Sequence, residues 1–265
     1  MAFSLLSRAR PALALLFVCA FLIVPPVNAQ ATEPLALPNI ELEAGGAVLA
    51  LARLADGRIV LGGQFSSVNG QIRNNLAMLD ADGVLVADWA PSADGEVRVI
   101  VAGAANEIFI GGDFGEIDGQ PRLGLAKLST VEALGSRLDP TWNPGADGAV
   151  LAMAYDSDGA LFVGGAFGNI GGGSRPRLAK LNAGGAGALI AGFQPGSLNG
   201  GPFVQTLALD EAGNQVYAGG QVAGPGGRQF VRRYQRTTGV RDAWNPDPNG
   251  RVSALHLAAD GGIFI

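Results

Sequence analysis

The stretch Ile59-Val-Leu-Gly-Gly-Gln-Phe65 decides the fold, because the sequence repeats it at regular intervals. Similar stretches lie at Ile108–Phe114 and Leu161–Phe167, a looser one lies at Val216–Val222, and Gly262–Ile265 begins a fifth. The first glycines of the four complete copies are 49, 53 and 55 residues apart. A sequence period near fifty residues is typical of repeat architectures, in which each repeat is one supersecondary unit.

Each unit contains further short segments that recur with the same spacing. An apolar segment such as Val48–Ala52 precedes the Gly-Gly stretch, and a turn such as Asp56-Gly57 separates the two, which predicts a β-hairpin. A Leu-Ala-x-Leu segment, Leu76–Leu79 in the first unit, and an aromatic-x-Pro segment, Trp89-Ala-Pro91, complete the unit. Four short strands in a unit of this length are the pattern of a β-propeller blade.

These patterns predict an all-β fold: a β-propeller of four-stranded blades of about fifty residues, with four complete units and a truncated fifth. Within each blade the predicted order is the apolar strand innermost, then the Gly-Gly, Leu-Ala-x-Leu and aromatic-x-Pro strands. An array of immunoglobulin-like sandwiches is the alternative, but each sandwich needs about seven strands in about 100 residues, twice the observed period. The predicted units are residues 48–96, 97–149, 150–203, 204–251 and the partial unit 252–265.

The combination of the Asp-Gly turn, the Gly-Gly stretch, a loop that ends in arginine, Leu-Ala-x-Leu and Trp-x-Pro resembles the delta-60 repeat. That repeat is similar in layout to kelch blades and occurs in secreted or surface β-propeller proteins of bacteria. The resemblance covers Val48 to the end of the chain and implies a propeller, with no general activity or catalytic residues to carry over. The fourth unit departs from the pattern, because it has Val222 in place of phenylalanine and Val231–Tyr234 in place of Leu-Ala-x-Leu. We therefore expect this unit to pack differently.

The first 29 residues are predicted to be a secretory signal peptide outside the fold. Arg8 and Arg10 precede the uncharged apolar run Pro11–Val24, and Val27-Asn-Ala29 has small residues at the −3 and −1 positions of a cleavage site. The alternative is a retained membrane anchor, which needs about 18 or more apolar residues. We therefore predict export, a secreted or cell-surface location, and no membrane span after cleavage.

Residues 30–47 are predicted to be a lead-in segment, in which Leu35–Leu37 and Ile40–Leu42 can each pair as an edge strand. A propeller closes only when its last blade has all of its strands, and the other terminus often supplies one. The fifth unit, however, stops at Ile265 within its second strand. We expect the sequence to be a fragment of a longer protein, whereas a protein that naturally ends there would have an open edge and would oligomerise.

The composition excludes several classes of protein. Charged residues make up 15% of the chain and hydrophobic residues 48%, which excludes disorder over most of the length. The net charge of −5 becomes −7 once the two arginines of the signal peptide are removed, which argues against a nucleic-acid partner. The only cysteine, Cys19, is removed with them, so the exported chain is predicted to depend on its core rather than on disulfides.

No catalytic, cofactor or metal site is predicted. His256 is the single histidine and is interpreted as a core or channel-lining residue, because a zinc site or a Ser-His-Asp triad needs partners that the sequence lacks. Asp80–Gly83 and Asp156–Gly159 resemble the start of a calcium loop, but no glutamate occupies the twelfth position of either. Both lie where a hairpin turn is expected, and we interpret them as turns.

Two kinds of recurring residue allow both a binding and a structural interpretation. The arginines that end the loops form a ring of anion contacts in the first interpretation, and the aromatic residues before the prolines form sugar-binding platforms. A residue present in every unit more often has a structural role. We therefore predict that each arginine holds its own unit together, for example by donating to nearby carbonyls or an aspartate, and that the aromatic residues are wedges between units. These residues are Arg73, Arg122, Arg175 and Arg228, and Trp89, Trp142, Phe193 and Trp244.

The sequence therefore predicts an exported binding or interaction module, whose ligand is a protein or a polysaccharide. Ligand binding is expected in the loops that differ most between units, because loops on a rigid scaffold commonly carry function. These loops are Gly171–Arg177, Pro195–Pro202 and Gly224–Tyr234.

The alternative prediction is a propeller-type carbohydrate-active enzyme, either a glycoside hydrolase or a lyase. A glycoside hydrolase needs two carboxylates about 5 to 10 Å apart on either side of the scissile bond. The only candidates for such a set are Glu96, Asp147 and Asp247, which are predicted to lie on loops before successive inner strands.

Overall fold

The computed structural model describes residues 40–104, 106–131, 137–196, 201–221, 223–224, 227–228 and 230–265. All of them belong to one compact unit of the chain, Leu37–Ile265. The described residues form strands, turns and loops, with no helix among them. The predicted signal peptide and the predicted edge strand Leu35–Leu37 lie outside the described residues. For the part that is described, the all-β fold class is confirmed.

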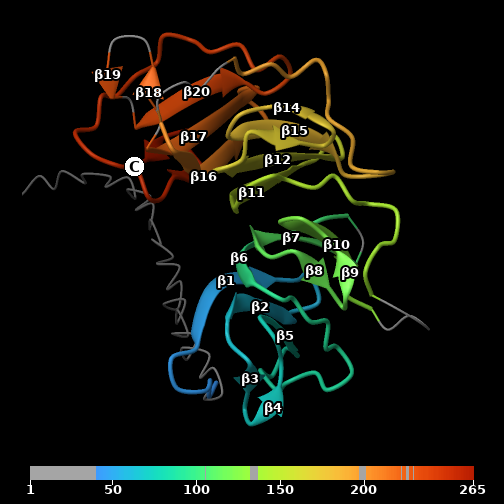
Figure 1. The fold of residues 1–265 in the computed structure, drawn as a ribbon. Coiled ribbons are helices and arrows are strands. Elements are labelled where there is room, and N and C mark those ends of the chain that lie inside the picture. Colours follow the sequence, from blue (N-terminus) through green and yellow to red (C-terminus); the bar gives the residue numbers. More distant parts are fainter. Residues whose placement is uncertain are drawn as a thin grey trace, which may run out of the picture. The chain divides into compact units, whose positions relative to one another are not determined.

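Four antiparallel sheets of three strands follow one another along the chain, one in each complete unit (Figure 1). In every sheet the Gly-Gly strand lies in the middle, between the apolar strand that precedes it and the strand that follows it. The sheets consist of β1 (Ala47–Arg53), β2 (Ile59–Gln64) and β5 (Leu76–Leu79); β6 (Glu96–Ala102), β7 (Glu107–Asp113) and β10 (Leu125–Ser129); β11 (Val150–Asp156), β12 (Ala160–Gly165) and β15 (Leu178–Asn182); and β16 (Phe203–Asp210), β17 (Gln215–Gln221) and β20 (Val231–Gln235).

The second glycine of each pair lies beside a β-bulge in the first strand of its own sheet. In the first unit the register shifts between Val48 and Ala50, where Val48 lies opposite Gly63. A Cβ atom at Gly63 would lie only 2.0 Å from the carbonyl oxygen of Ala47, so the bulge needs a residue without a side chain. The same approach, at 2.0 to 2.5 Å, occurs at Gly112, Gly165 and Gly220.

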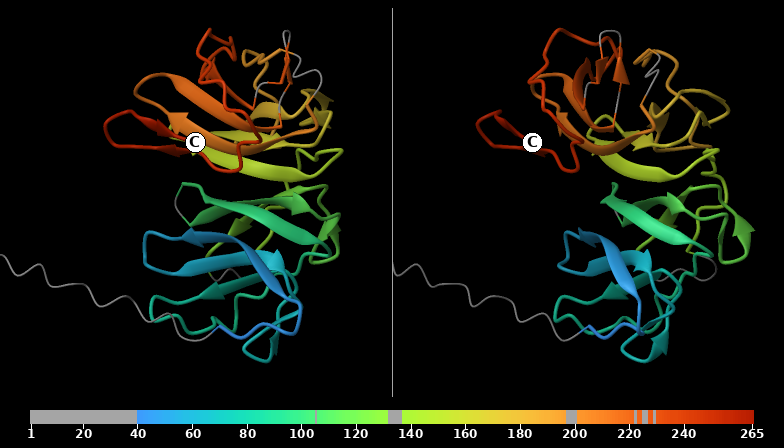
Figure 2. Two further views of the ribbon diagram at one scale, coloured as in Figure 1. Left: turned by 90° about the vertical axis from the view of Figure 1, so that its left-hand side faces the viewer. Right: turned by 60° about the vertical axis from the view of Figure 1, so that its left-hand side comes forward.

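The first glycine of each pair makes room for the next unit. A Cβ atom at Gly62 would lie 2.7 Å from Cγ1 of Val97, the buried leading valine of the second unit. The first strands of successive units are also neighbours, from β1 to β6, β11 and β16, and the two views of Figure 2 agree with this stacking. Corresponding contacts, at 2.6 to 2.7 Å, join Gly111 to Val150, Gly164 to Val204 and Gly219 to Val252. We call each of these contacts a glycine–valine lock.

The apolar core lies between successive sheets rather than within a single one. One cluster joins Val60 and Met78 of the first sheet to Val97 and Ile100 of the second. Two further clusters join the second sheet to the third and the third to the fourth. A single unit therefore leaves much of its apolar surface uncovered, which is why such units are stable only when they are stacked.

Between its second and third strands, each of the four complete units forms a short hairpin that we call the arm. In the first three units, a residue that precedes the first strand makes a single β-bridge with the arm, as Ala93 does with Ile117. The sequence predicted here only a loop that ends in arginine. The arms are β3 (Ser67–Val68) with β4 (Gln71–Ile72), β8 (Glu116–Ile117) with β9 (Gln120–Pro121), β13 (Asn169–Ile170) with β14 (Gly173–Ser174), and β18 (Ala223–Gly224) with β19 (Gly227–Arg228).

The predicted four-stranded blade is not confirmed, because each sheet has three strands in the described part of the chain. Where an outer strand is predicted, the chain makes one bridge with the third strand and then leaves it. In the first unit this bridge joins Leu79 to Leu85, before the segment Trp89-Ala-Pro91. Proline has no N–H to donate and the tryptophan turns inward, so this segment does not extend the ladder. The corresponding bridges are Leu128 to Leu138, Leu181 to Leu189 and Tyr234 to Arg241.

The fifth unit, residues 252–265, is less regular than its sequence predicts. The pattern predicts a first strand at Val252–His256, whereas the structure has a short pair of strands, β21 (His256–Leu257) and β22 (Ile263–Phe264). Val252 is nevertheless buried in the fourth glycine–valine lock. The lock therefore forms even where the strand that normally carries the valine does not.

Candidate functional site

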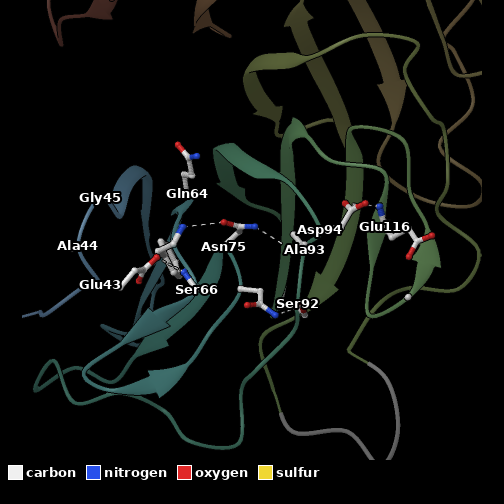
Figure 3. Close-up of a pocket in the computed structure, with 13 residues that line it drawn as sticks. Glu43, Ala44, Gly45, Gln64, Ser66, Asn75, Ser92, Ala93, Asp94 and Glu116 are labelled. Carbon is white, nitrogen blue, oxygen red and sulfur yellow. Dashed lines mark hydrogen bonds between the residues drawn. The ribbon is translucent and has the colours of Figure 1, made fainter.

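A polar groove of about 660 Å³ lies between the first and second units, beside their arms (Figure 3). We call it the first groove. Its lining comes from the end of β2 and the residues between β2 and the first arm, the second arm, the loop before β5, and the segments that lead into β1 and β6. The polar side chains in this lining belong to Glu43, Gln64, Ser66, Asn74, Asn75, Ser92, Asp94 and Glu116.

Two carboxylates at this groove hold the arms in place. Glu43 accepts a hydrogen bond from the backbone N–H of Ser66 at 2.5 Å. Asp94 Oδ1 accepts from the backbone N–H groups of Gly115 and Glu116 at 2.8 and 2.9 Å, at the start of the second arm. The bond from Ser66 lowers the pKa of Glu43, because it favours the charged form. Each carboxylate thus satisfies backbone donors at the beginning of an arm.

Two asparagines connect the units across the groove. Asn75 has a φ of 64°, a left-handed conformation that asparagine tolerates better than most residues. Its Oδ1 accepts from the N–H of Phe65 at 3.0 Å, and its Nδ2 donates to the carbonyl of Ala93 at 2.9 Å. Asn74 Nδ2 donates to Ser92 Oγ at 3.1 Å. The lining is therefore held in position, and such groups lose little freedom when a ligand binds.

Other polar groups of the groove remain available to a ligand. Gln64 and Glu116 are exposed, and neither side chain bonds to another described residue. Asp94 uses only Oδ1 in its hydrogen bonds, which leaves Oδ2. The lining contains carboxylates, amides and hydroxyls but no lysine or arginine. Such a lining can exchange hydrogen bonds with hydroxyl or amino groups, and it repels anions.

The residues that line the first groove were not predicted from the sequence. Of the three loops in which binding was expected, Gly171–Arg177 does not line the first groove, and the other two are only partly described. One feature of the sequence could have indicated the groove, namely the variable residue that follows each recurring arginine. In the first three units this residue is Asn74, Leu123 or Pro176. The variation at this position was visible, but its place beside a groove was not.

The recurring arginines of the first two units hold their own units together, as predicted. Arg73 is 7% exposed and donates to the carbonyl oxygens of Ile72 and Ala87 at 2.7 and 2.9 Å. Arg122 likewise donates to the carbonyl of Asp139 at 2.9 Å, whereas the described bond of Arg175 goes to the carbonyl of the preceding residue, Ser174, at 2.8 Å. The side chain of the fourth arginine lies outside the described residues.

The recurring aromatic residues are wedges between units rather than exposed platforms. Trp89 is buried and donates from Nε1 to the carbonyl of Ser129 at 3.0 Å, at the end of the third strand of the second unit. Trp142 makes the corresponding bond into the third unit at 3.0 Å. Phe193 is also buried, whereas Trp244 in the last complete unit is half-buried. The wedge interpretation is confirmed for the first three.

The three carboxylates nominated for glycoside hydrolysis have separate surroundings. Glu96 forms an ion pair with Arg98 on β6. Asp147 accepts from the N–H of Asn169 at 2.8 Å in the third arm, and this bond lowers the pKa of Asp147. Asp247 lies in an exposed turn with a φ of 50°. No contact between described residues joins the three carboxylates.

The remaining sequence candidates are structural or exposed. His256 is exposed on β21, so it is not a core residue. Asp80 Oδ1 accepts from the N–H groups of Asp82 and Val84 at 3.0 and 2.8 Å, which is the predicted turn. Asp156 is fully buried and pairs with a lysine instead of lining an open loop. Within the described residues, no group of three histidine, cysteine, aspartate or glutamate side chains can hold a metal ion.

A family model described as a β-propeller domain of unknown function, DUF5122, matches residues 54–85 and 157–186. The two matches contain the Gly-Gly strands of the first and third units, and they support a β-propeller family. No curated protein matches the sequence. No helix in the described part of the chain has the length and apolar character needed to cross a membrane.

Solved structures resemble this chain in fold alone. The extracellular domain of a one component system from B. thetaiotaomicron has a TM-score of 0.51 at 14% identity, over 82% of this chain and 24% of that chain. The chain therefore spans about a quarter of that structure. The designed protein Ika8 has a TM-score of 0.46 at 16% identity, and a protein of unknown function from Bacteroides caccae has 0.48 at 13%. These two matches cover 82% of this chain and 70% and 74% of those chains.

Proposed function

We propose that this protein is an exported β-propeller that binds an uncharged polysaccharide at the cell surface or outside the cell, through the first groove. The observation that carries the proposal is the lining of that groove, in which amides, carboxylates and hydroxyls converge on one cavity. Export rests on the predicted signal peptide, and it agrees with the occurrence of a similar fold in an extracellular domain.

The chemistry of the lining favours a ligand rich in hydroxyl groups. The amide of Gln64 offers both a donor and an acceptor, and the free oxygens of Asp94 and Glu116 are acceptors for hydroxyl hydrogens. Ligands that carry phosphate, sulfate or carboxylate groups are disfavoured, because the lining has three carboxylates and neither lysine nor arginine. A neutral sugar chain meets both conditions.

A protein ligand is less well supported by this lining. Protein interfaces are centred on buried aromatic or arginine side chains that fill a pocket of the partner. The aromatic residue of the groove, Phe65, is only 4% exposed, and the neighbouring Arg73 is buried and committed to carbonyls. We therefore propose a polysaccharide rather than a protein as the ligand.

The test is a binding screen of the full-length protein against purified polysaccharides: neutral glucans, mannans and galactans, an anionic polygalacturonate, and chitosan. We expect retention by at least one neutral polysaccharide and none by polygalacturonate. Gln64→Ala should weaken that binding about five- to tenfold, since one hydrogen bond contributes about 1 kcal/mol. Because the side chain of Gln64 bonds to no other described residue, the fold should be unaffected.

Gln221→Ala is the matched control, because Gln221 holds the corresponding position at the end of β17 and does not line the first groove. It should bind as the unmodified protein does. Failure to bind any neutral polysaccharide, or equal losses in the two variants, would contradict the proposal. Saccharide turnover at the groove would instead favour the enzyme alternative.

A further inference from the structure

A second groove, of about 350 Å³, lies between the second and third units. It occupies the same position relative to the second and third units as the first groove does relative to the first and second. Its lining again comes from the end of the Gly-Gly strand, the loop before the third strand, and the segment that leads into the next unit. The lining residues are Gly112 to Phe114, Leu123, Gly124 and Ala146 to Gly148.

The two grooves share one backbone framework. The N–H of Ala93 donates to the carbonyl of Asn74 at 3.1 Å in the first, and the N–H of Ala146 donates to the carbonyl of Leu123 at 2.8 Å in the second. Asp147 accepts a hydrogen bond from a backbone N–H group of the third arm, as Asp94 does from one of the second arm. The left-handed φ of 64° at position 75 recurs as 68° at position 124.

The side chains that face the ligand differ between the grooves. The amides of Asn74 and Asn75 are replaced by Leu123 and Gly124, and Gln64 is replaced by Asp113. Leu123 is a large apolar residue, yet it is 58% exposed. The second groove thus offers an apolar lip where the first offers amides. A sugar ring presents hydroxyl groups at its edge and C–H groups on its face, so the two linings suit different aspects of a saccharide.

The grooves are adjacent because a single short segment borders both. Asp113 lines the second groove and Glu116 lines the first, with only two residues between them. Three residue steps of chain span at most about 11 Å, even when fully extended. A linear chain of a few sugar residues is long enough to occupy both grooves at once.

We infer that the two grooves are consecutive subsites for one linear, uncharged polysaccharide, with the first groove binding hydroxyl edges and the second packing Leu123 against a ring face. This inference rests on the proposed function. Occupation of the first groove brings the next part of the same chain to the second, so the second contact forms at a high effective concentration. Affinity should therefore depend on ligand length.

The experiment uses linear gluco- and manno-oligosaccharides, from disaccharides to octasaccharides, titrated into the full-length protein by calorimetry. We expect affinity to rise about tenfold or more at the length that first spans both grooves, and to level off beyond it. Leu123→Ala should remove most of that rise and leave the affinity for the shortest ligand that binds unchanged. Gln64→Ala should weaken binding at every length.

Val84→Ala is the control for Leu123→Ala, because Val84 is also an exposed apolar residue but lines neither groove. It should leave every affinity unchanged. Binding that is sensitive to Gln64→Ala but independent of both length and Leu123 would overturn this inference alone. If no saccharide of any kind binds, the proposed function fails, and this inference fails with it.

Discussion

The boundary between the first and second units and the boundary between the third and fourth are built on the same apolar contact. At the first boundary a Cβ atom at Gly62 would lie 2.7 Å from Val97 Cγ1, and at the other a Cβ atom at Gly164 would lie 2.6 Å from Val204 Cγ1. Each valine is fully buried. The glycine–valine lock is therefore independent of the polar residues around it.

The polar contacts at these two boundaries are different. The first boundary has the bond from Trp89 Nε1 to the carbonyl of Ser129. At the other, Phe193 replaces the tryptophan and has no such donor, and a buried ion pair takes its place. Asp156, with a fully buried side chain, contacts Lys180 of its own unit at 3.0 Å and Arg236 of the next unit.

The repeat therefore specifies the glycine–valine lock in every complete unit, whereas the polar contacts differ from one boundary to another. A stacked repeat gains stability from nearest-neighbour interfaces, so each boundary can be tested by substitutions at that boundary alone. The following substitutions should separate the shared lock from the local contacts.

The largest effect is expected from Asp156→Asn. Removing one partner of a buried ion pair leaves the others without compensation, and the free energy of unfolding should fall by roughly 3 kcal/mol. Urea unfolding at neutral pH measures this loss. Asp158→Asn is the control, because Asp158 also contacts Arg236 but its side chain is 63% exposed, and its loss should be small. Equal losses in the two variants would show that burial is not what matters here.

A smaller and matched pair of effects is expected from Gly62→Ala and Gly164→Ala. Each added methyl group overlaps the valine of the next unit, and overpacking of this kind costs about 2 kcal/mol. Thermal or urea unfolding should show similar losses at the two boundaries. Gly184→Ala is the control, because a Cβ atom there would meet nothing within 4 Å. A large difference between the two lock variants would mean that the boundaries do not share one lock.

Trp89→Phe is expected to cost about 1 kcal/mol, since it removes the Nε1 donor and leaves the carbonyl of Ser129 without that partner. Trp142→Phe should cost about as much, because it makes the same bond to the carbonyl of Asn182. Phe193→Leu, by contrast, should change stability only through packing. If Trp89→Phe is as stable as the unmodified protein, the hydrogen bond does not contribute to the first boundary.

The smallest effect is a pH dependence at the boundary between the third and fourth units. Burial opposes ionisation of Asp156, but the hydrogen bond from Lys180 and the charge of Arg236 outweigh it and lower the pKa of the carboxyl. A lowered native pKa adds stability above the unfolded value, near pH 4, and this stability is lost as the pH falls through the native pKa. The stability gap between the unmodified protein and Asp156→Asn should therefore narrow below about pH 4. A constant gap from pH 7 to pH 3 would contradict this pKa shift.

Much of the fold could be predicted from the sequence, because the signals were local and were repeated. The Gly-Gly stretch and the apolar strands predicted the hairpins of all four complete units, with an Asp-Gly turn as a further signal in the first and third. The recurrence of Arg73 and Trp89 indicated structural roles. The outer strand was predicted from Trp89-Ala-Pro91 but has only a single bridge before it. Alternation and proline position did not reveal that the tryptophan turns inward.

The first groove was not predictable in the same way, since its lining extends from Glu43 to Gly119 along the chain. No local pattern joins Asn75 to the carbonyl of Ala93, or Asp94 to the arm of the second unit. The residues that vary between repeats were visible, but their positions around a shared cavity depend on how two units stack. For the same reason, the nomination of Asp147 as a catalytic candidate did not anticipate its bonds to the third arm.

By itself, the sequence determined that the protein is a series of similar all-β units, because strand periodicity, turn chemistry and the fifty-residue repeat act over short distances along the chain. The structural role of each glycine in a Gly-Gly pair was decided only by the tertiary structure. The second glycine admits a backbone carbonyl of its own unit, and the first admits a valine 33 to 40 residues further along the chain. The grooves likewise exist only between stacked units, because their opposite walls belong to different repeats.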